Sequence, residues 1–450
     1  MSDSPPWYLE PWRPLLNRKI FAERMIRTPL PLSNLHLKPA QQAYDALDDA
    51  LGDVFVACQQ SIDLGEVIVA TAVHHLTKRY TDGEQDYLRR VNSRVINHEP
   101  EFIPPIPITG HAGVGKSSII RAISRAIGSP TRVKVGGLEI MPVPFAMVPV
   151  GIAKSQLAVV RRLGVVGKNL EDCCASAQRI LYRNATGILS FGELQFVNQS
   201  STANTLVAGI LLQAGYLGVP SAYDANFSLM WRLRKRPPEE RDRLLENPIV
   251  IFPDVPGSQD AIAISQAMLA VAPGIFEIDL NADGLELDVR SGGLRRMKRR
   301  LLSLAYLIKR RDAKQSEVRV SIDDIRSAYQ SNLFKDSRLT IEELARRQDR
   351  SRDNKEDDLC CPFDEPRTAA QARDQANCDF RNSQVAENEF LAALSAKEKK
   401  NLALQSERKV TQRRSQASSR ASELKPKTKN SDRALNSAAL AAELAGVNSH

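Results

Sequence analysis

The sequence predicts an α/β protein in which a parallel sheet surrounds a phosphate-binding loop. Residues 110–117 spell a complete G-x-x-x-x-G-K-S motif, which is the first observation. The second is that apolar, strand-like runs alternate with helical patterns between residues 101 and 281. The third is the context of the motif, because a short apolar run precedes it and residues with helical spacing follow it. We therefore expect the motif to connect a buried strand to the start of a helix.

The residue types of the motif indicate its chemistry. Glycines let backbone N–H groups turn toward phosphates, the lysine reaches the β- and γ-phosphates, and the next hydroxyl can ligate Mg²⁺. The start of the following helix attracts the same anion. We expect ATP and Mg²⁺ as cofactors, with Ser117 as the metal ligand. The residues expected to bind the nucleotide are Gly110, His111, Ala112, Gly113, Val114, Gly115, Lys116, Ser117 and Ser118.

Five short apolar runs are the expected strands of the sheet. They are residues 103–109, 144–150, 187–191, 218–223 and 249–253. Helical spacing follows the motif, and it also predicts two helices near the N-terminus. One of these is marked by Leu47, Leu51, Val54 and Cys58, and the other spans residues 67–76.

Composition divides the 450 residues into four stretches. Residues 1–100 are expected to form a helical, partner-binding N-terminal extension, residues 101–281 an α/β core, and residues 282–344 a basic helical lid. Residues 345–450 have few apolar side chains to offset chain entropy, so we expect a disordered basic tail. Residues 397–433 hold twelve Lys or Arg against four acidic side chains. This tail is either a solvated segment or an arm for DNA or an acidic partner.

Composition also excludes some classes. No run of apolar residues is long enough for a transmembrane helix, and the N-terminal residues lack the pattern of a secretion signal. Six cysteines are scattered without a C-x-x-C pair, so we expect reduced thiols and no zinc site in a cytoplasmic protein. The net charge of +9 suits contact with nucleic acid, although charge alone is a weak indication.

A second strand should end in an acidic residue that holds Mg²⁺. The best candidate is the run 186–191, which is followed by Gly192 and Glu193. Glycine supplies no ligand, so either Mg²⁺ binding and turnover are reduced, or another acid such as Asp254 compensates. In the first case, Gly192→Asp should raise turnover. Glu193 has a simpler alternative role, which is to cap a helix.

The order of these motifs resembles the AAA+ ATPases of the TnsC/TniB type, which regulate cut-and-paste DNA transposons. The resemblance spans roughly residues 103–334. Besides the phosphate-binding loop, it rests on Gly192-Glu193-Leu194-Gln195, where the family has Asp-Glu-x-Gln. It rests above all on an ordered string: Asn226-Phe227-Ser228-Leu229, Arg236-Pro237, Glu240-Arg241, Arg243-Leu244-Leu245, Pro248-Ile249-Val250 and Pro253-Asp254.

The resemblance implies roles for two residues at strand ends. Glu193 would polarise the attacking water, and Asn226 would sense the γ-phosphate, with Asp224 as the second choice for that sensor. A capping or turn role for Asn226 remains the alternative.

The resemblance also implies roles for arginines. Arg241 and Arg243 would offer a finger to the nucleotide of a neighbouring subunit, unless they only form surface pairs. Arg296, with Arg295 as the second choice, would touch the nucleotide from the lid. A solvated basic helix face is the alternative for both.

As such a regulator, the chain would form a ring or filament of identical subunits on duplex DNA without sequence preference. It would link a target-selection protein to the transposase subunits, with no membrane involved. Lys154, Arg161 and Arg162 are the expected DNA contacts. A general AAA+ motor or clamp-loader-like protein is the first alternative, which Gly192 disfavours. A non-catalytic interaction module is the second, which the intact Lys116 and Ser117 disfavour.

Overall fold

The computed structural model describes residues 6–93, 101–129, 131–151, 155–192, 194, 203–313, 317–347, 359–363, 367–395 and 398. The chain divides into two compact units, residues 1–380 and residues 381–450. Helix α16 (Arg367–Ala393) contains the boundary between them. All other elements, and the candidate site, belong to the first unit. The expected tail, residues 345–450, therefore contains a long helix, and most of its remaining residues lie outside the described part.

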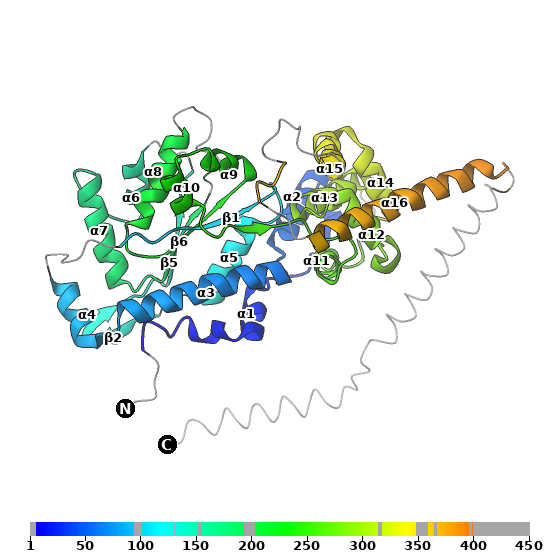
Figure 1. Cartoon of the computed structure of the whole chain (residues 1–450). Helices are drawn as coiled ribbons and strands as arrows, with labels where there is room; N and C mark the ends of the chain where they lie inside the picture. The colour runs from blue at the N-terminus through cyan, green and yellow to red at the C-terminus, as the bar shows by residue number, and fades with distance from the viewer. Residues whose placement is uncertain are drawn as a thin grey trace, which may run out of the picture. The chain divides into compact units, whose positions relative to one another are not determined.

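A five-stranded parallel sheet lies at the centre of the first unit (Figure 1). Its order is β4-β5-β6-β1-β7, with β1 between β6 and β7. All five predicted strands are confirmed: β1 (Ile106–Gly110), β4 (Phe145–Pro149), β5 (Ile188–Gly192), β6 (Ser221–Ala225) and β7 (Ile249–Ile251). The structure adds a hairpin of β2 (Val133–Val135) and β3 (Leu138–Ile140).

Helices cover both faces of the sheet, which explains why its strands are apolar runs without strict alternation. On one face, Ile188 and Ala222 pack with residues of the helix that follows the phosphate-binding motif. On the other face, Leu189 and Tyr223 pack with the helices that connect β4, β5, β6 and β7. The helix on the first face is α5 (Lys116–Ile127). Those on the other face are α6 (Gln156–Arg161), α7 (Leu170–Arg183), α8 (Ala203–Gly215), α9 (Phe227–Arg234) and α10 (Pro238–Leu244).

The N-terminal helices add to cores that other parts of the chain form. Trp12 and Phe21 are fully buried with α5, whereas Leu47 and Leu51 are buried among the later helices. The elements are η1 (Arg13–Leu16), α1 (Arg18–Met25), η2 (Leu35–Leu37), α2 (Ala40–Asp53), α3 (Gln59–Arg79) and α4 (Gly83–Asn92). The helix predicted through Cys58 is too long. It ends at Asp53, because Val54 is extended and Phe55 pairs with Arg27 in a β-bridge.

The helices from α11 to α15, called the lid below, share a third core with α2. They lie together beyond one end of the sheet (Figure 1). Their bounds are α11 (Gln259–Leu269), α12 (Leu280–Ser291), α13 (Arg295–Asp312), α14 (Ile322–Gln330), η4 (Asn332–Phe334) and α15 (Lys335–Arg347). In the described part of the chain, no helix is both long and apolar enough to span a membrane.

Candidate nucleotide-binding site

The phosphate-binding motif forms the predicted strand–loop–helix. Strand β1 ends at Gly110, and α5 begins at Lys116. Gly113 and Gly115 have φ angles of 87° and 112°, a region that favours glycine, so the motif glycines meet a backbone requirement. The loop therefore leads directly into the start of a twelve-residue helix, whose N–H groups attract anions.

The side chain of Lys116 donates to oxygen atoms of the loop and of Asn226. Its Nζ donates to the carbonyl oxygens of Gly110 at 2.7 Å and His111 at 3.0 Å, and to Oδ1 of Asn226 at 3.0 Å. Asn226 is the N-cap residue of α9, but its side chain makes no capping hydrogen bond. The capping role considered for Asn226 is therefore wrong for its side chain, which instead contacts the lysine of the loop.

Ser117 is paired with a carboxylate that the sequence singled out for another role. Its Oγ donates to Oδ2 of Asp224 at 2.6 Å, and Asp224 is only 3% exposed. Asp224 lies on β6, where it pairs with Ile108 of β1. The hydroxyl expected to bind the metal ion thus lies against an acidic side chain from the neighbouring strand.

Asp224 also lies beside the glycine that interrupts the expected acidic pair. Phe191 of β5 pairs with Tyr223 of β6, so Gly192 and Asp224 are the next residues of two adjacent strands. A Cβ atom added at Gly192 would lie 3.4 Å from Oδ1 of Asp224. Sequence reasoning missed this arrangement. The only signal in the sequence was that each residue follows an apolar run. That the two residues are neighbours could be known only from the register of the strands.

Asp254, the other acid considered for the metal, is engaged by the lid. Its Oδ2 lies 3.4 Å from Nε of Arg295, and its backbone N–H donates to the Gly293 carbonyl at 2.9 Å. Gly293 has a φ of 65°, and a Cβ there would lie 2.2 Å from the Asp254 carbonyl oxygen. The close approach of lid and sheet therefore requires glycine at this position.

Arg295 is a largely buried side chain that contacts several groups. Besides Asp254, its Nη2 lies 2.8 Å from Sγ of Cys58. Burial opposes the charge of Arg295, but Asp254 and Cys58 hold its pKa above the ordinary value. This guanidinium connects the lid to the sheet and to the residue before α3.

Arg296 approaches the loop itself. Its backbone N–H donates to the Gly113 carbonyl at 3.1 Å, and a Cβ added at Gly113 would lie 3.0 Å from its Cβ. The side chain of Arg296 is exposed, whereas that of Arg295 is bound to Asp254. Of the two arginines proposed as the lid sensor, Arg296 therefore has the side chain that solvent and a ligand can reach.

Among the described residues, no hydrogen bond or ion pair joins the remaining predicted catalytic residues, or Lys154, to the loop. Glu193 and Lys154 lie outside the described residues. Arg241 pairs with Asp242 at 2.9 Å, and Arg243 contacts the hydroxyl of Tyr216 at 3.2 Å. These arginines were proposed to act on a neighbouring subunit, and contacts within one subunit do not test that role.

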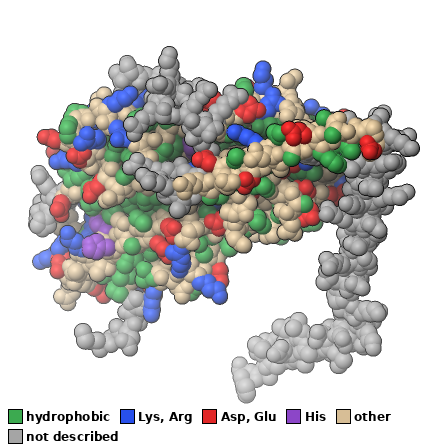
Figure 2. Space-filling view, turned by 45° about the vertical axis from the view of Figure 1, so that its right-hand side comes forward, with side chains coloured by type: hydrophobic (Ala, Val, Ile, Leu, Met, Phe, Trp, Pro, Cys, Tyr) green, Lys and Arg blue, Asp and Glu red, His purple; other side chains and the backbone are tan. Residues whose placement is uncertain are grey.

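The proposed DNA contacts that can be seen are surface arginines at the end of α6. Arg161 donates to the Gly167 carbonyl at 3.0 Å, and Arg162 donates to the Val150 carbonyl at 2.6 Å. Both are exposed. Figure 2 shows basic and acidic side chains interspersed on the face that it draws, so the described residues of that face form no single basic band.

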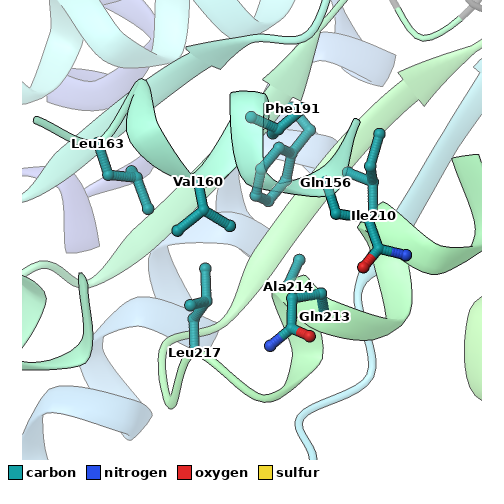
Figure 3. A pocket seen from close by; sticks show the side chains of 9 residues that line it. Gln156, Val160, Leu163, Phe191, Ile210, Gln213, Ala214 and Leu217 are labelled. Atoms are coloured by element: carbon teal, nitrogen blue, oxygen red, sulfur yellow. The ribbon is translucent and has the colours of Figure 1, made fainter. Parts of the chain in front are cut away.

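A small cavity lies between α6, α8 and β5 (Figure 3). Its volume is about 10 Å³, enough for one water at most, and it is lined mainly by apolar side chains such as Phe191. Because side chains alternate along a strand, Phe191 faces away from the side of the sheet where Gly192 and Asp224 meet. We regard the cavity as a packing gap, separate from the nucleotide site.

The sheet order identifies the type of α/β fold. The strand that ends in Gly192 is separated from the phosphate-loop strand by one strand, β6, and a helical lid closes against the loop. This is the α/β fold of AAA+ ATPases, as predicted.

Comparisons with known proteins add solved structures of low similarity. No family model and no curated protein matches the sequence. The structure is similar to the Aeropyrum pernix ORC1 protein in complex with DNA, with 17% identity, a TM-score of 0.40, and coverage of 67% of this chain and 70% of that one. It is also similar to Cdc6p from Pyrobaculum aerophilum, with 13% identity, a TM-score of 0.36, and coverage of 66% and 79%. The fold type therefore rests on the strand order and the loop.

Proposed function

We propose that this protein is an ATPase of the AAA+ class that regulates DNA transposition in the manner of the TnsC/TniB proteins. One observation carries the nucleotide part of the proposal. Side chains from three separate elements meet at the phosphate-binding loop: Lys116 and Ser117 from α5, Asn226 from the end of β6, and Arg296 from the lid. An ATP switch needs this convergence, because the same phosphate must be sensed by both the sheet and the lid.

The residues suggest a division of labour at the bound nucleotide. Lys116 would exchange its carbonyl partners for phosphate oxygens. Asn226, which already accepts from Lys116, would sense whether the γ-phosphate is present. Arg296 would contact the phosphate from the lid, since its backbone N–H already donates to the Gly113 carbonyl. Ser117 would hold the Mg²⁺ that accompanies ATP, whose charge would offset that of the phosphates. Glu193 would polarise the attacking water.

The transposition part rests on the resemblance, above all on the ordered string from Asn226 to Asp254. It implies that ATP-bound subunits assemble as a ring or filament on duplex DNA. Arg241 or Arg243 would then reach the nucleotide of the next subunit. Lys154, Arg161 and Arg162 would contact phosphates, and the N-terminal segment and basic tail would bind the transposase and the target-selection protein.

Electron microscopy of the full-length protein tests this function. The protein is imaged with duplex DNA of unrelated sequences, with and without a non-hydrolysable ATP analogue. We expect regular rings or filaments on every duplex only when the analogue is present, and their yield should fall as salt rises. Lys116→Ala is the matched control, which should give no assemblies. Assembly without DNA, together with rapid hydrolysis, would favour a general AAA+ motor instead.

A further inference from the structure

We propose that Asp224 supplies the acidic group that β5 lacks, and that it holds the metal ion of MgATP together with Ser117. The acidic residue of the site would thus lie on β6 in this chain, whereas the AAA+ pattern has it on the strand equivalent to β5, where this chain has Gly192. This inference rests on the proposed nucleotide function and names the residue through which the site holds its metal ion.

The register of the sheet brings the two positions together. In the AAA+ pattern the acid follows the strand equivalent to β5, where this chain has Gly192. Phe191 pairs with Tyr223, so the next residue on each strand, Gly192 and Asp224, are neighbours on the same face of the sheet. A carboxylate on β6 therefore reaches the region that a carboxylate on β5 would occupy.

The glycine provides the space that this carboxylate needs. Since a Cβ at position 192 would already lie 3.4 Å from Oδ1 of Asp224, a longer acidic side chain there would meet that carboxylate directly. Two carboxylates at such close range cannot both stay ionised without a large penalty. The site therefore has room for one acidic side chain, and glycine at position 192 leaves that room to Asp224.

The surroundings of Asp224 favour a function for its charge. All five residues of β6 are buried, and its neighbours Tyr223 and Ala225 are fully buried in an apolar core. An apolar side chain would pack well on a central strand, whereas burying a carboxylate costs free energy of folding unless the carboxylate is hydrogen-bonded or paired. One of its hydrogen bonds comes from Ser117, the residue that the motif dedicates to the metal ion.

The available donors fit magnesium. Mg²⁺ prefers oxygen ligands and is commonly bound by one or two carboxylates together with phosphates and water. Ser117 Oγ and the Asp224 carboxylate are such donors, and they are already 2.6 Å apart. In the described part of the chain, no cluster of three or more His, Cys, Asp or Glu could hold a metal by itself. The nucleotide phosphates would therefore complete the ligand set.

The competing explanation is that Asp224 only anchors Ser117 and thereby the start of α5. The two explanations differ in their dependence on metal. An anchor supports nucleotide binding equally with and without Mg²⁺, whereas a metal ligand contributes only when Mg²⁺ is present. Asp224→Asn separates the two, because asparagine has the same size and keeps an oxygen that accepts from Ser117.

The experiment measures the affinity of the full-length protein for a fluorescent ATP analogue, in Mg²⁺ and in EDTA. For Asp224→Asn we expect about a 10–100-fold loss in Mg²⁺, the range seen when groups that support a metal ion are removed, and less than a twofold change in EDTA. The apparent affinity for Mn²⁺ at saturating nucleotide, measured by electron paramagnetic resonance, should fall by the same factor. An equal loss in Mg²⁺ and in EDTA would overturn the proposal.

A double-mutant cycle moves the acid back to β5. Gly192→Asp alone should weaken Mg²⁺-dependent binding, because two carboxylates then compete for one space. Asp224→Ala alone should also weaken it, while Gly192→Asp with Asp224→Ala should recover at least tenfold over the worse single variant. Improved binding by Gly192→Asp alone would overturn the proposal. If Asp224→Ala does not fold, Asp224→Asn still decides. If the unaltered protein binds no nucleotide under either condition, the proposed function fails, and this inference fails with it.

Discussion

Two buried carboxylates of the first unit, Asp288 in the lid and Asp224 in the sheet, have very different partners. Asp288 is 1% exposed, and its Oδ1 lies 2.6 Å from Nζ of Lys298, while its Oδ2 accepts from the Gly257 N–H at 2.9 Å. Asp224 is 3% exposed and accepts from the neutral hydroxyl of Ser117. Burial is nearly the same, so burial does not distinguish a structural acid from a functional one.

The partners do distinguish them. Lys298 also donates to Ser265, so the lid pair is a closed arrangement whose groups bind one another inside a helical core. Asp224 instead accepts from Ser117, which belongs to the phosphate-binding motif and is the residue of that motif expected to bind a metal. A buried charge bonded to a fixed opposite charge indicates stability, whereas one bonded to a ligand-binding residue indicates function.

Breaking the lid pair should have the largest effect on the folded state. Lys298→Met keeps the length of the side chain but leaves the Asp288 carboxylate buried without its ammonium. We expect the free energy of unfolding to fall by about 3–5 kcal/mol, the usual cost of removing one partner of a buried pair. Denaturant unfolding measures this change, and nucleotide affinity of the folded fraction should be unchanged.

The control for this variant is Lys298→Met combined with Asp288→Asn. Asparagine keeps an acceptor for the Gly257 N–H and carries no charge, so most of the lost stability should return. If the double variant is no more stable than Lys298→Met, then lost packing rather than an unpaired charge causes the effect.

The phosphate loop should show the opposite pattern, with a large effect on binding and a small one on stability. Lys116→Ala removes a cation that would bond the nucleotide phosphates. We expect ATP affinity to fall by about 10–150-fold, from about 1.5–3 kcal/mol for hydrogen bonds between charged groups. Isothermal titration calorimetry measures the affinity. Assembly on DNA by this variant at the normal ATP concentration would contradict the proposed function.

The two arginines that begin α13 repeat the comparison within one turn of helix. Arg296→Ala should lower nucleotide affinity by about tenfold and change stability by less than about 0.5 kcal/mol, as for an exposed side chain. Arg295→Met should instead lower stability, because the buried Asp254 carboxylate then loses the guanidinium of Arg295 as its partner. If Arg295→Met affects only nucleotide binding, the assignment of the two arginines is reversed.

The smallest expected effect is the pH dependence of the contact between α2 and the lid. Burial alone would raise the pKa of Asp48, but hydrogen bonds from Arg299 and Ser303 hold that pKa below its ordinary value. The contact therefore stabilises the fold above the ordinary aspartate pKa of about 3.9, and this contribution is lost as pH falls through the lower folded value. Thermal melts between neutral pH and about pH 3 should show a smaller acid-induced decrease for Asp48→Asn than for the unaltered protein.

The sequence by itself determined the loop, its helix and the five strands. The reason is local: glycines at positive φ, apolar runs and helical spacing each act within a few residues. It also placed Asn226 at the tip of a strand, although it left the capping role open. The expected helix through Cys58 was too long, because its end depends on the bridge between Phe55 and Arg27, which are distant in sequence.

Only the tertiary structure decided which acid accompanies Ser117. From the sequence, either Gly192 left the site without a ligand, in which case Gly192→Asp should raise turnover, or another acid such as Asp254 compensated. The strand register instead places Asp224 beside Gly192, and the lid engages Asp254 through Arg295. Register and lid closure are set by packing among segments far apart in the chain. No local pattern could therefore show that a glycine on one strand and an aspartate on the next share one space.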